Sequence, residues 1–224
     1  MRIKRTQVSS PPDARLRFDP GAMDLEESPR TFFLRKTETV ARDLIGSWLA
    51  RRYHGEWYGA RIVETEAYLG SKDAAAHSFR GRRTPRVEPM YKDGGHLYVF
   101  FVYGMHHCAN VVTRPAEIAE AVLLRAAEAP PPAPLNLLSG PGRLCAALGI
   151  TVADSGKDLL AGGDIRLFRR MGKRPRIEVT ARVGVDYAGD AKDWPLRFFD
   201  TGSDAVSKPP RNTSTQKHRD RRDT

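Results

Sequence analysis

Hydrophobic residues recur along the chain at two spacings, which predict one amphipathic helix and several strands. Val40, Leu44, Ile45 and Leu49 follow Thr37 at helical spacing. We therefore expect Thr37 to be the N-cap of a helix that faces the core.

Strands are predicted where polar and apolar residues alternate and where apolar residues follow one another. Residues 52–68 predict a hairpin around His54-Gly55-Glu56, with clear alternation in its second strand. Residues 97–103 form the most apolar run, and residues 106–112 predict its return strand. Further strands are expected at 121–127, 165–168, 177–183 and 196–199, and a short helix at 144–148. Because helices and strands do not alternate regularly, the pattern favours the α+β class, a single mixed domain on an antiparallel sheet.

The two ends of the chain differ from its middle. Residues 1–28 mix prolines with scattered charges and show no periodicity, which predicts a flexible N-terminal arm. Residues 203–224 predict a disordered basic tail, so the folded domain is expected at 29–202. Inside it, residues 70–95 form a long polar connection, which predicts a functional or mobile loop.

The charge of the chain suits a polyanionic partner. The 37 Lys and Arg residues exceed the 27 Asp and Glu residues, giving a net charge of +10. Residues 203–224 contribute only three of these positive charges, and residues 1–28 are balanced. The excess therefore lies mostly on the predicted domain, where it suits nucleic acid or an anionic membrane surface, although a generally basic protein is also possible.

The sequence argues against several other classes of protein. Its two cysteines, Cys108 and Cys145, are too few for a disulfide framework or a zinc module. No stretch is apolar enough for a signal peptide or for a membrane span of about 20 residues. We therefore expect a soluble, cytoplasmic protein. His106, His107 and Cys108 are adjacent, which would send them to opposite faces of a strand, so no metal and no cofactor is expected.

Two carboxylates and one arginine form the first candidate site. On a strand, Glu64, Glu66 and Tyr68 project to one face, and a solvated face is the simplest explanation for the two glutamates alone. Arg125 lies within an apolar strand, where a guanidinium needs an anionic partner. If Glu64 or Glu66 is that partner, the pair could orient a water molecule and take its proton. A structural ion pair, or an Arg125 that reaches solvent, remains the alternative.

Aromatic and basic residues could contact nucleic acid. Tyr98 and Phe100 share a face of the apolar strand, and Tyr103 falls at the turn, where it could wedge between base steps. An inward-facing ring could stack on an extruded base, although ordinary core aromatics fit equally well. Four arginines of the 70–95 connection could contact phosphates, although most such charge runs are only solvated: Arg80, Arg82, Arg83 and Arg86.

Several motifs in one order resemble the alkyladenine DNA glycosylase family, also called 3-methyladenine or methylpurine DNA glycosylases. The motifs are Arg61-Ile-Val-Glu-Thr-Glu-Ala-Tyr-Leu-Gly70, Ala75-Ala-His-Ser78, Thr84-Pro-Arg86, Leu97-Tyr-Val, Val102-Tyr-Gly-Met105 and Ser139-Gly-Pro141. Arg182-Val-Gly-Val185 and Pro195-Leu-Arg-Phe198 extend the similarity, which covers about Phe32 to Gly202. Many motifs in one order are far more specific than any single motif.

The resemblance implies a curved antiparallel sheet with flanking helices and a protruding hairpin that enters the minor groove. It implies that the enzyme flips an alkylated purine from duplex DNA and hydrolyses its bond to deoxyribose, leaving an abasic site. Glu66 would be the general base, and Arg125 and the Val183 carbonyl would help to hold the water. Base-pocket and wedge residues are implied as well: Tyr68, His77, Phe100 and Asn110 around the base, and Tyr103 with Met105 at the DNA wedge.

The sequence departs from the family pattern at several positions. Phe100 stands where the family often has Tyr, so stacking is kept but a hydroxyl hydrogen bond is lost. Residues 203–206 lack the usual Pro and aromatic residue. The sequence also leaves two other functions open, a non-catalytic minor-groove protein that binds damaged or distorted DNA and an RNA-binding domain. We expect a monomer.

Overall fold

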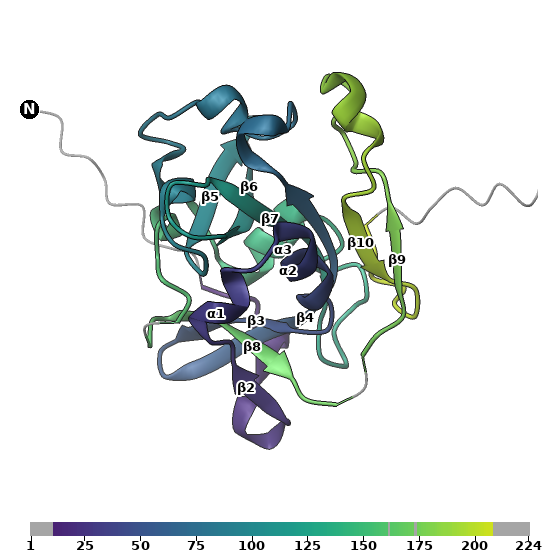
Figure 1. The fold of residues 1–224 in the computed structure, drawn as a ribbon. Helices are drawn as coiled ribbons and strands as arrows, with labels where there is room; N and C mark the ends of the chain where they lie inside the picture. The colour runs from purple at the N-terminus through teal and green to yellow at the C-terminus, as the bar shows by residue number, and fades with distance from the viewer. Residues whose placement is uncertain (1–10, 161, 173, 208–224) are drawn as a thin grey trace, which may run out of the picture.

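The computed structural model describes residues 11–160, 162–172 and 174–207, and in them ten strands form one antiparallel sheet (Figure 1). The path β2-β8-β3-β4-β7-β6-β5 runs across it, while β1 and β10 also pair with β4, and β9 pairs with β10. The strands are β1 (Arg17–Phe18), β2 (Leu25–Glu27), β3 (Trp48–Tyr53), β4 (Glu56–Tyr68), β5 (Leu97–Val102), β6 (His106–Thr113), β7 (Glu120–Glu128), β8 (Ile165–Arg170), β9 (Ile177–Thr180) and β10 (Arg197–Asp200). The predicted α+β class is confirmed.

The long strand β4 changes partners along its length. Its first half pairs with β3, whereas its second half pairs with β7 on one side and with β10 on the other. In Figure 1, β3 and β8 lie near the bottom of the molecule and β5 and β6 rise toward the top. The sheet therefore changes direction along β4, and the second half of this strand lies between two groups of strands.

Two helices cover one face of the sheet. Helix α2 (Thr37–Asp43) packs on β4, β7 and β10, and helix α3 (Pro141–Leu148) packs on β6 and β7. The short helix α1 (Arg30–Phe33) precedes α2 and contacts it. Thr65 on β4 donates a hydrogen bond of 2.9 Å to the Ala41 carbonyl of α2. Thr65 therefore faces the helices, and its neighbour Glu66 projects to the other face.

The opposite face of the sheet carries one row of paired residues across five strands. Tyr98 pairs with Asn110, Asn110 with Leu123, Leu123 with Glu66, and Glu66 with Arg197. Directly paired residues of an antiparallel sheet project to the same side. The row therefore brings together residues from β5, β6, β7, β4 and β10 on the face that the helices leave uncovered.

The connection between β4 and β5 packs against this second face. It contains three 3-10 helices, η3 (Gly70–Lys72), η4 (Phe79–Gly81) and η5 (Glu88–Tyr91). Met90 of η5 is buried in a cluster with Tyr98 and Ala121 of the sheet. The predicted loop, residues 70–95, is thus ordered and packs beside the row of paired residues.

The first predicted helix is shorter than its hydrophobic spacing suggested. Lys36, not Thr37, is its N-cap, and the Thr37 hydroxyl lies 2.7 Å from the hydroxyl of Thr113. The helix ends at Asp43, and Gly46 follows with a φ of 92°, a conformation that favours glycine. Leu49 is therefore wrongly assigned to the helix, because it lies in β3, although it is fully buried.

The remaining elements match their predictions, with shifted ends. The hairpin strands, the strands near 121–127, 165–168 and 196–199, and the helix at 144–148 are all present. The strand predicted at 177–183 stops at Thr180, which frees the following residues to cross toward β4.

The predicted N-terminal arm is wrong for residues 11–28, which pack on the sheet. Strand β1 pairs with β4 and strand β2 with β8, so both use edges that the sheet leaves open. Leu16 is fully buried, and the Phe18 ring stacks on Trp48 with 5.0 Å between centroids. These apolar contacts offset the entropy of ordering the segment. The rest of the predicted arm lies outside the described residues.

The predicted disordered tail also begins too early. Residues 203–207 return to the sheet, and Ala205 is fully buried against Val63 and Ala126. Two apolar contacts and several hydrogen bonds hold this segment in place. It is therefore ordered, although its polar composition predicted disorder. Residues 208–224 lie outside the described residues.

Candidate active site

Two compensating bulges shape the sheet at the centre of the site. Ile62 pairs with Ala127 and Glu64 with Ala126, which leaves Val63 as an extra residue on β4. Thr65 then pairs with Leu124, which leaves Arg125 as an extra residue on β7. Bulges re-aim a side chain without ending the sheet. Simple alternation predicted that Val63 would face away from Glu64, toward the main core. Because of the bulges, Val63 instead packs in a separate cluster with Ala205.

The Glu66 carboxylate is fully buried, and three groups surround it. The Val183 amide donates a hydrogen bond of 2.7 Å to Oε1, and the Tyr68 hydroxyl donates one of 2.9 Å to Oε2. Nη1 of Arg125 lies 3.4 Å from Oε1. Glu66 is therefore held in one orientation by residues from three separate parts of the chain.

The neighbouring carboxylate, Glu64, is a charge partner for two arginines. Its Oε1 accepts hydrogen bonds from Nε of Arg125 at 3.0 Å and from Nε of Arg197 at 2.7 Å. Its Oε2 accepts the Ser207 amide at 2.8 Å. Arg125 thus contacts both glutamates, and the ion pair that the sequence left open exists in the structure.

The two carboxylates have opposite pKa shifts. Burial alone would raise the pKa of Glu64, but the guanidinium groups of Arg125 and Arg197 lower it below its ordinary value. Burial raises the pKa of Glu66, although Arg125, the Val183 amide and Tyr68 oppose this shift. A carboxylate with a raised pKa is the better proton acceptor, so Glu66 suits the role of a base and Glu64 that of a fixed counterion.

A second buried ion pair lies behind Tyr68. The side chains of Arg182 and Asp73 are completely buried, with 2.8 Å between Arg182 Nη2 and Asp73 Oδ1. Arg182 also donates a hydrogen bond of 3.1 Å to the Ala67 carbonyl, and its Cζ lies 4.7 Å from the centre of the Tyr68 ring. This pair fixes the ring that contacts Glu66.

Sequence reasoning assigned no role to Asp73, Arg182, Arg197 or Ser207. Arg197 lies between Leu196 and Phe198. Its apolar neighbours predict burial and a need for an anionic partner, as they do for Arg125. Arg182 lay within a motif of the resemblance. Asp73 and Ser207 lie in polar segments, and nothing in the local sequence indicates that they reach the site.

Aromatic rings gather at the β5 end of the row of paired residues that contains Glu66. Nδ1 of His77 lies 2.8 Å from the Tyr98 hydroxyl, and the His77 and Phe100 rings meet edge to face with 4.6 Å between centroids. Burial, with the charges of Arg86 and Arg82, lowers the pKa of His77 to about 4. A neutral imidazole and electron-rich rings favour a flat cation over a neutral ring.

Asn110 lies in the row between Tyr98 and Leu123 and is 4% exposed. Its Nδ2 donates a hydrogen bond of 3.1 Å to the Tyr98 carbonyl. The amide is therefore fixed in orientation on the same face as Glu66.

The hairpin between β5 and β6 ends in exposed apolar side chains. Tyr103 is 86% exposed and Met105 is 69% exposed. Tyr103 has a φ of 53° and Gly104 a φ of 67°, so the tight turn holds the Tyr103 ring clear of the sheet. An apolar residue that the fold leaves this exposed is a candidate contact for a partner.

The four predicted phosphate contacts fall into two groups. Arg83 donates hydrogen bonds to both Glu88 and Glu117, at 2.6 Å to each, so its donors are already used. Arg80 follows Phe79, and its Cζ lies 5.1 Å from the centre of that ring. Neither Arg83 nor Arg80 is among the charges that lower the pKa of His77.

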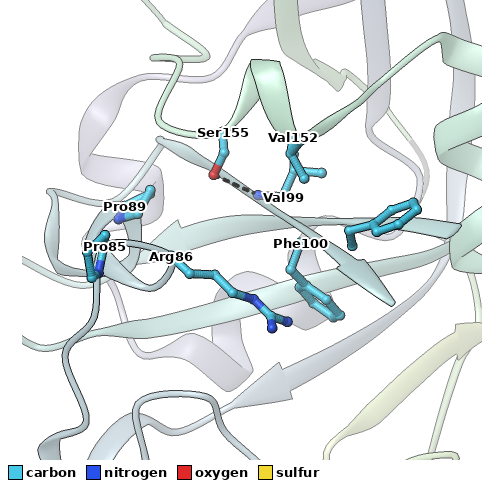
Figure 2. Close-up of a pocket in the computed structure, with 8 residues that line it drawn as sticks. Pro85, Arg86, Pro89, Val99, Phe100, Val152 and Ser155 are labelled. Carbon is cyan, nitrogen blue, oxygen red and sulfur yellow. Dashed lines mark hydrogen bonds between the residues drawn. The ribbon is translucent and has the colours of Figure 1, made fainter. Parts of the chain in front are cut away.

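Arg82 and Arg86 lie closer to the site. The charges of both lower the pKa of His77, and Arg86 Cζ lies 5.6 Å from the centre of the Phe100 ring. Figure 2 shows Arg86 extended beside Phe100 at the rim of a hollow of about 360 Å³. The hollow follows the outer edge of β5 and excludes Glu66, and it is lined by Pro85, Arg86, Pro89, Val99, Phe100, Phe101, Val152 and Ser155.

In the described part of the chain, no three His, Cys, Asp or Glu side chains are grouped so that they could hold a metal ion. In the same residues, no helix has the length and apolar character needed to cross a membrane.

Comparisons with known proteins match most of the chain to one family. The family model of methylpurine-DNA glycosylase matches residues 31–204. A protein of Desulfitobacterium hafniense is 44% identical over 197 residues, covering 80% of this chain and 97% of the relative. A protein of Bdellovibrio bacteriovorus is 47% identical over 185 residues, covering 76% and 93%. Both are provisionally named 3-methyladenine DNA glycosylases. The chain therefore belongs to the methylpurine-DNA glycosylase family.

Proposed function

We propose that this protein removes alkylated purines, of the 3-methyladenine and 7-methylguanine type, from duplex DNA by hydrolysing the N-glycosidic bond. The product is an abasic site, because water rather than an amine is the nucleophile. The observation that carries the proposal is the buried Glu66 carboxylate with Arg125 Nη1 at 3.4 Å and the Val183 amide at 2.7 Å.

In the proposed reaction, a water oxygen attacks C1′ of the deoxyribose as the bond from C1′ to the purine nitrogen breaks. The electron pair of that bond goes to the alkylated purine, which leaves as a neutral base because alkylation had made it cationic. Glu66 takes the proton of the water. Arg125 helps to hold the water by donating a hydrogen bond to its oxygen, and the Val183 carbonyl by accepting one from its second hydrogen.

The base must leave the duplex before water can reach C1′. We propose that Tyr103 fills the gap in the stack, with Met105 beside it, because the fold leaves both side chains exposed at the hairpin tip. The everted purine would lie against Tyr68, His77 and Phe100. Asn110 would reject normal guanine by contact with its exocyclic amino group.

The proposed phosphate contacts are Arg82 and Arg86, with weaker contributions from Arg80 and Arg83. Because every residue of the site comes from one chain, a monomer suffices. We propose that it acts in the cytoplasm, in association with the nucleoid if the organism is bacterial.

The test is base release from methylated duplex DNA under single-turnover conditions. Glu66→Gln is expected to slow release by about 10²–10⁴-fold, the usual contribution of a general base. Glu178→Gln, which changes an exposed glutamate of β9, is the matched control and should leave the rate unchanged. Protein that binds the duplex but releases no base would instead be a non-catalytic DNA-binding protein, and an equally active Glu66→Gln variant would exclude Glu66 as the base.

A further inference from the structure

The segment after β10 returns to the site and ends on the charged cluster. Nη2 of Arg125 donates a hydrogen bond of 3.2 Å to the Ser207 hydroxyl, and the Ser207 amide donates one of 2.8 Å to Oε2 of Glu64. One residue from the end of the described chain thus contacts both the arginine and its counterion.

The segment is anchored independently of these two bonds. Ala205 is fully buried against Val63 and Ala126. The Ser139 hydroxyl donates a hydrogen bond of 3.4 Å to the Val206 carbonyl. Ser207 is therefore presented to Arg125 by a packed segment.

The three contacts of Arg125 use different edges of its guanidinium. Nε bonds Glu64, Nη2 bonds Ser207, and Nη1 lies 3.4 Å from Glu66. A guanidinium is planar, so fixing two of its nitrogens fixes the direction of the third. The backbone offers little help here, because Arg125 is the extra residue of a bulge.

We propose that Ser207 is a positioning residue for the glycosylase reaction, acting with Glu64 to aim Arg125 at Glu66. Residues 203–207 are thus part of the site. The catalytic arrangement is complete only when this segment is packed against the sheet. This inference rests on the proposed function, in which Arg125 and Glu66 act on the same water.

The expected effect of losing the Ser207 hydroxyl follows from charge and geometry. Without it, one buried N–H of Arg125 lacks a partner, and the guanidinium can rotate away from Glu66. Arg125 lowers the pKa of Glu66, so a looser Arg125 lets that pKa rise. The other titratable or charged groups around Glu66 stay unchanged: Glu64 and Tyr68 on β4, Cys108 on β6, Arg197 on β10, and Arg182 and Tyr187 beyond β9.

The experiment compares full-length Ser207→Ala with Ser207→Thr, which keeps the hydroxyl, and with Ser155→Ala. Ser155 is the matched control, because its hydroxyl also accepts a hydrogen bond, from the Val99 amide at the edge of β5. Ser207→Ala is expected to slow single-turnover base release by about 10-fold, because Arg125 is no longer held in its orientation toward Glu66. The acid limb of its pH profile should move to higher pH, while duplex affinity stays unchanged and the loss of one hydrogen bond lowers Tm by only a few degrees. Ser207→Thr should restore both rate and profile.

A second measurement does not depend on activity. Hydrogen exchange of the Arg125 Nε–H, followed by NMR, should be faster in Ser207→Ala than in the unaltered protein and in Ser155→Ala. Wild-type exchange and a wild-type pH profile in Ser207→Ala would overturn the positioning role, as would a rate loss that is fully explained by unfolding of the variant at the assay temperature. Failure of the proposed function looks different, because the unaltered protein would then release no base while the Arg125 signal still responded to Ser207→Ala.

Discussion

The Tyr68 hydroxyl donates a hydrogen bond of 2.9 Å to Oε2 of Glu66, its neighbour on the same face of β4. Burial raises the pKa of Glu66, and this hydrogen bond opposes that rise. A base must be ionised, so activity should fall as pH drops through the raised pKa of Glu66. The acid limb should therefore lie above the pKa of an ordinary glutamate.

Tyr68→Phe is expected to move this acid limb to higher pH. Without the donated hydrogen bond the carboxylate is less stabilised, so its pKa rises further. The measurement is the single-turnover rate of 7-methylguanine release from about pH 5 to pH 9. His77 should add no limb in this range, because its pKa is about 4. An unchanged acid limb in Tyr68→Phe would contradict the role of Tyr68 in tuning Glu66.

Tyr103→Ser is expected to impair base flipping more than duplex binding. The lost ring no longer replaces the stacking of the everted base, which is worth a few kcal/mol, so release should slow by about 10-fold or more. Phosphate contacts remain, so affinity for undamaged duplex should change little. A fluorescent base opposite the lesion reports flipping, and Met171→Ser, at another exposed apolar residue, is the control. Equal losses of binding and flipping would argue against a wedge.

Arg86→Ala is expected to reduce the salt dependence of duplex binding, with a slope of log K against log salt that is smaller by about 1. Arg86 has no carboxylate partner among the ion pairs of the described residues, whereas Arg83 bonds Glu88 and Glu117. Arg83→Ala should therefore change the slope by less than Arg86→Ala does. Titrations of both variants at several salt concentrations decide this point. The same slope change in both variants would mean that the ion pairs of Arg83 open on DNA.

Asp73→Ala is expected to lower the free energy of unfolding by about 3–5 kcal/mol, because it leaves the buried Arg182 charge unpaired. Glu26→Ala removes the partner of Arg169 in an exposed pair and should cost less than about 1 kcal/mol. Urea unfolding at neutral pH measures both values. A small effect in Asp73→Ala would mean that water or another group replaces the lost carboxylate at Arg182.

Much of the frame of the site could be predicted from local pattern. Alternation on β4 predicted that Glu64, Glu66 and Tyr68 share a face, and the apolar run with its turn predicted the hairpin that exposes Tyr103. The burial of Arg125 also followed from its apolar neighbours. These features could be predicted because each depends only on residues that are close in the sequence.

The structure differs from the sequence-based prediction at Leu49 and at residues 11–28. Leu49 continued a helical spacing but lies in β3, because Gly46 lets the chain reverse after α2. Residues 11–28 looked like an arm but add strands to open edges of the sheet. In the second case, tertiary contacts outweighed a weak local preference.

The sequence by itself determined the class of fold, the shared face of Glu66 and Tyr68, and the need of Arg125 for an anion. Only the tertiary structure decided which anions Arg125 meets, through two bulges that shift the register of β4 and β7. It also decided that Ser207 and Asp73, from distant polar segments, complete the charged cluster and its support. The physical reason is that periodicity fixes the face a side chain projects to, whereas register and chain return fix which charges meet there.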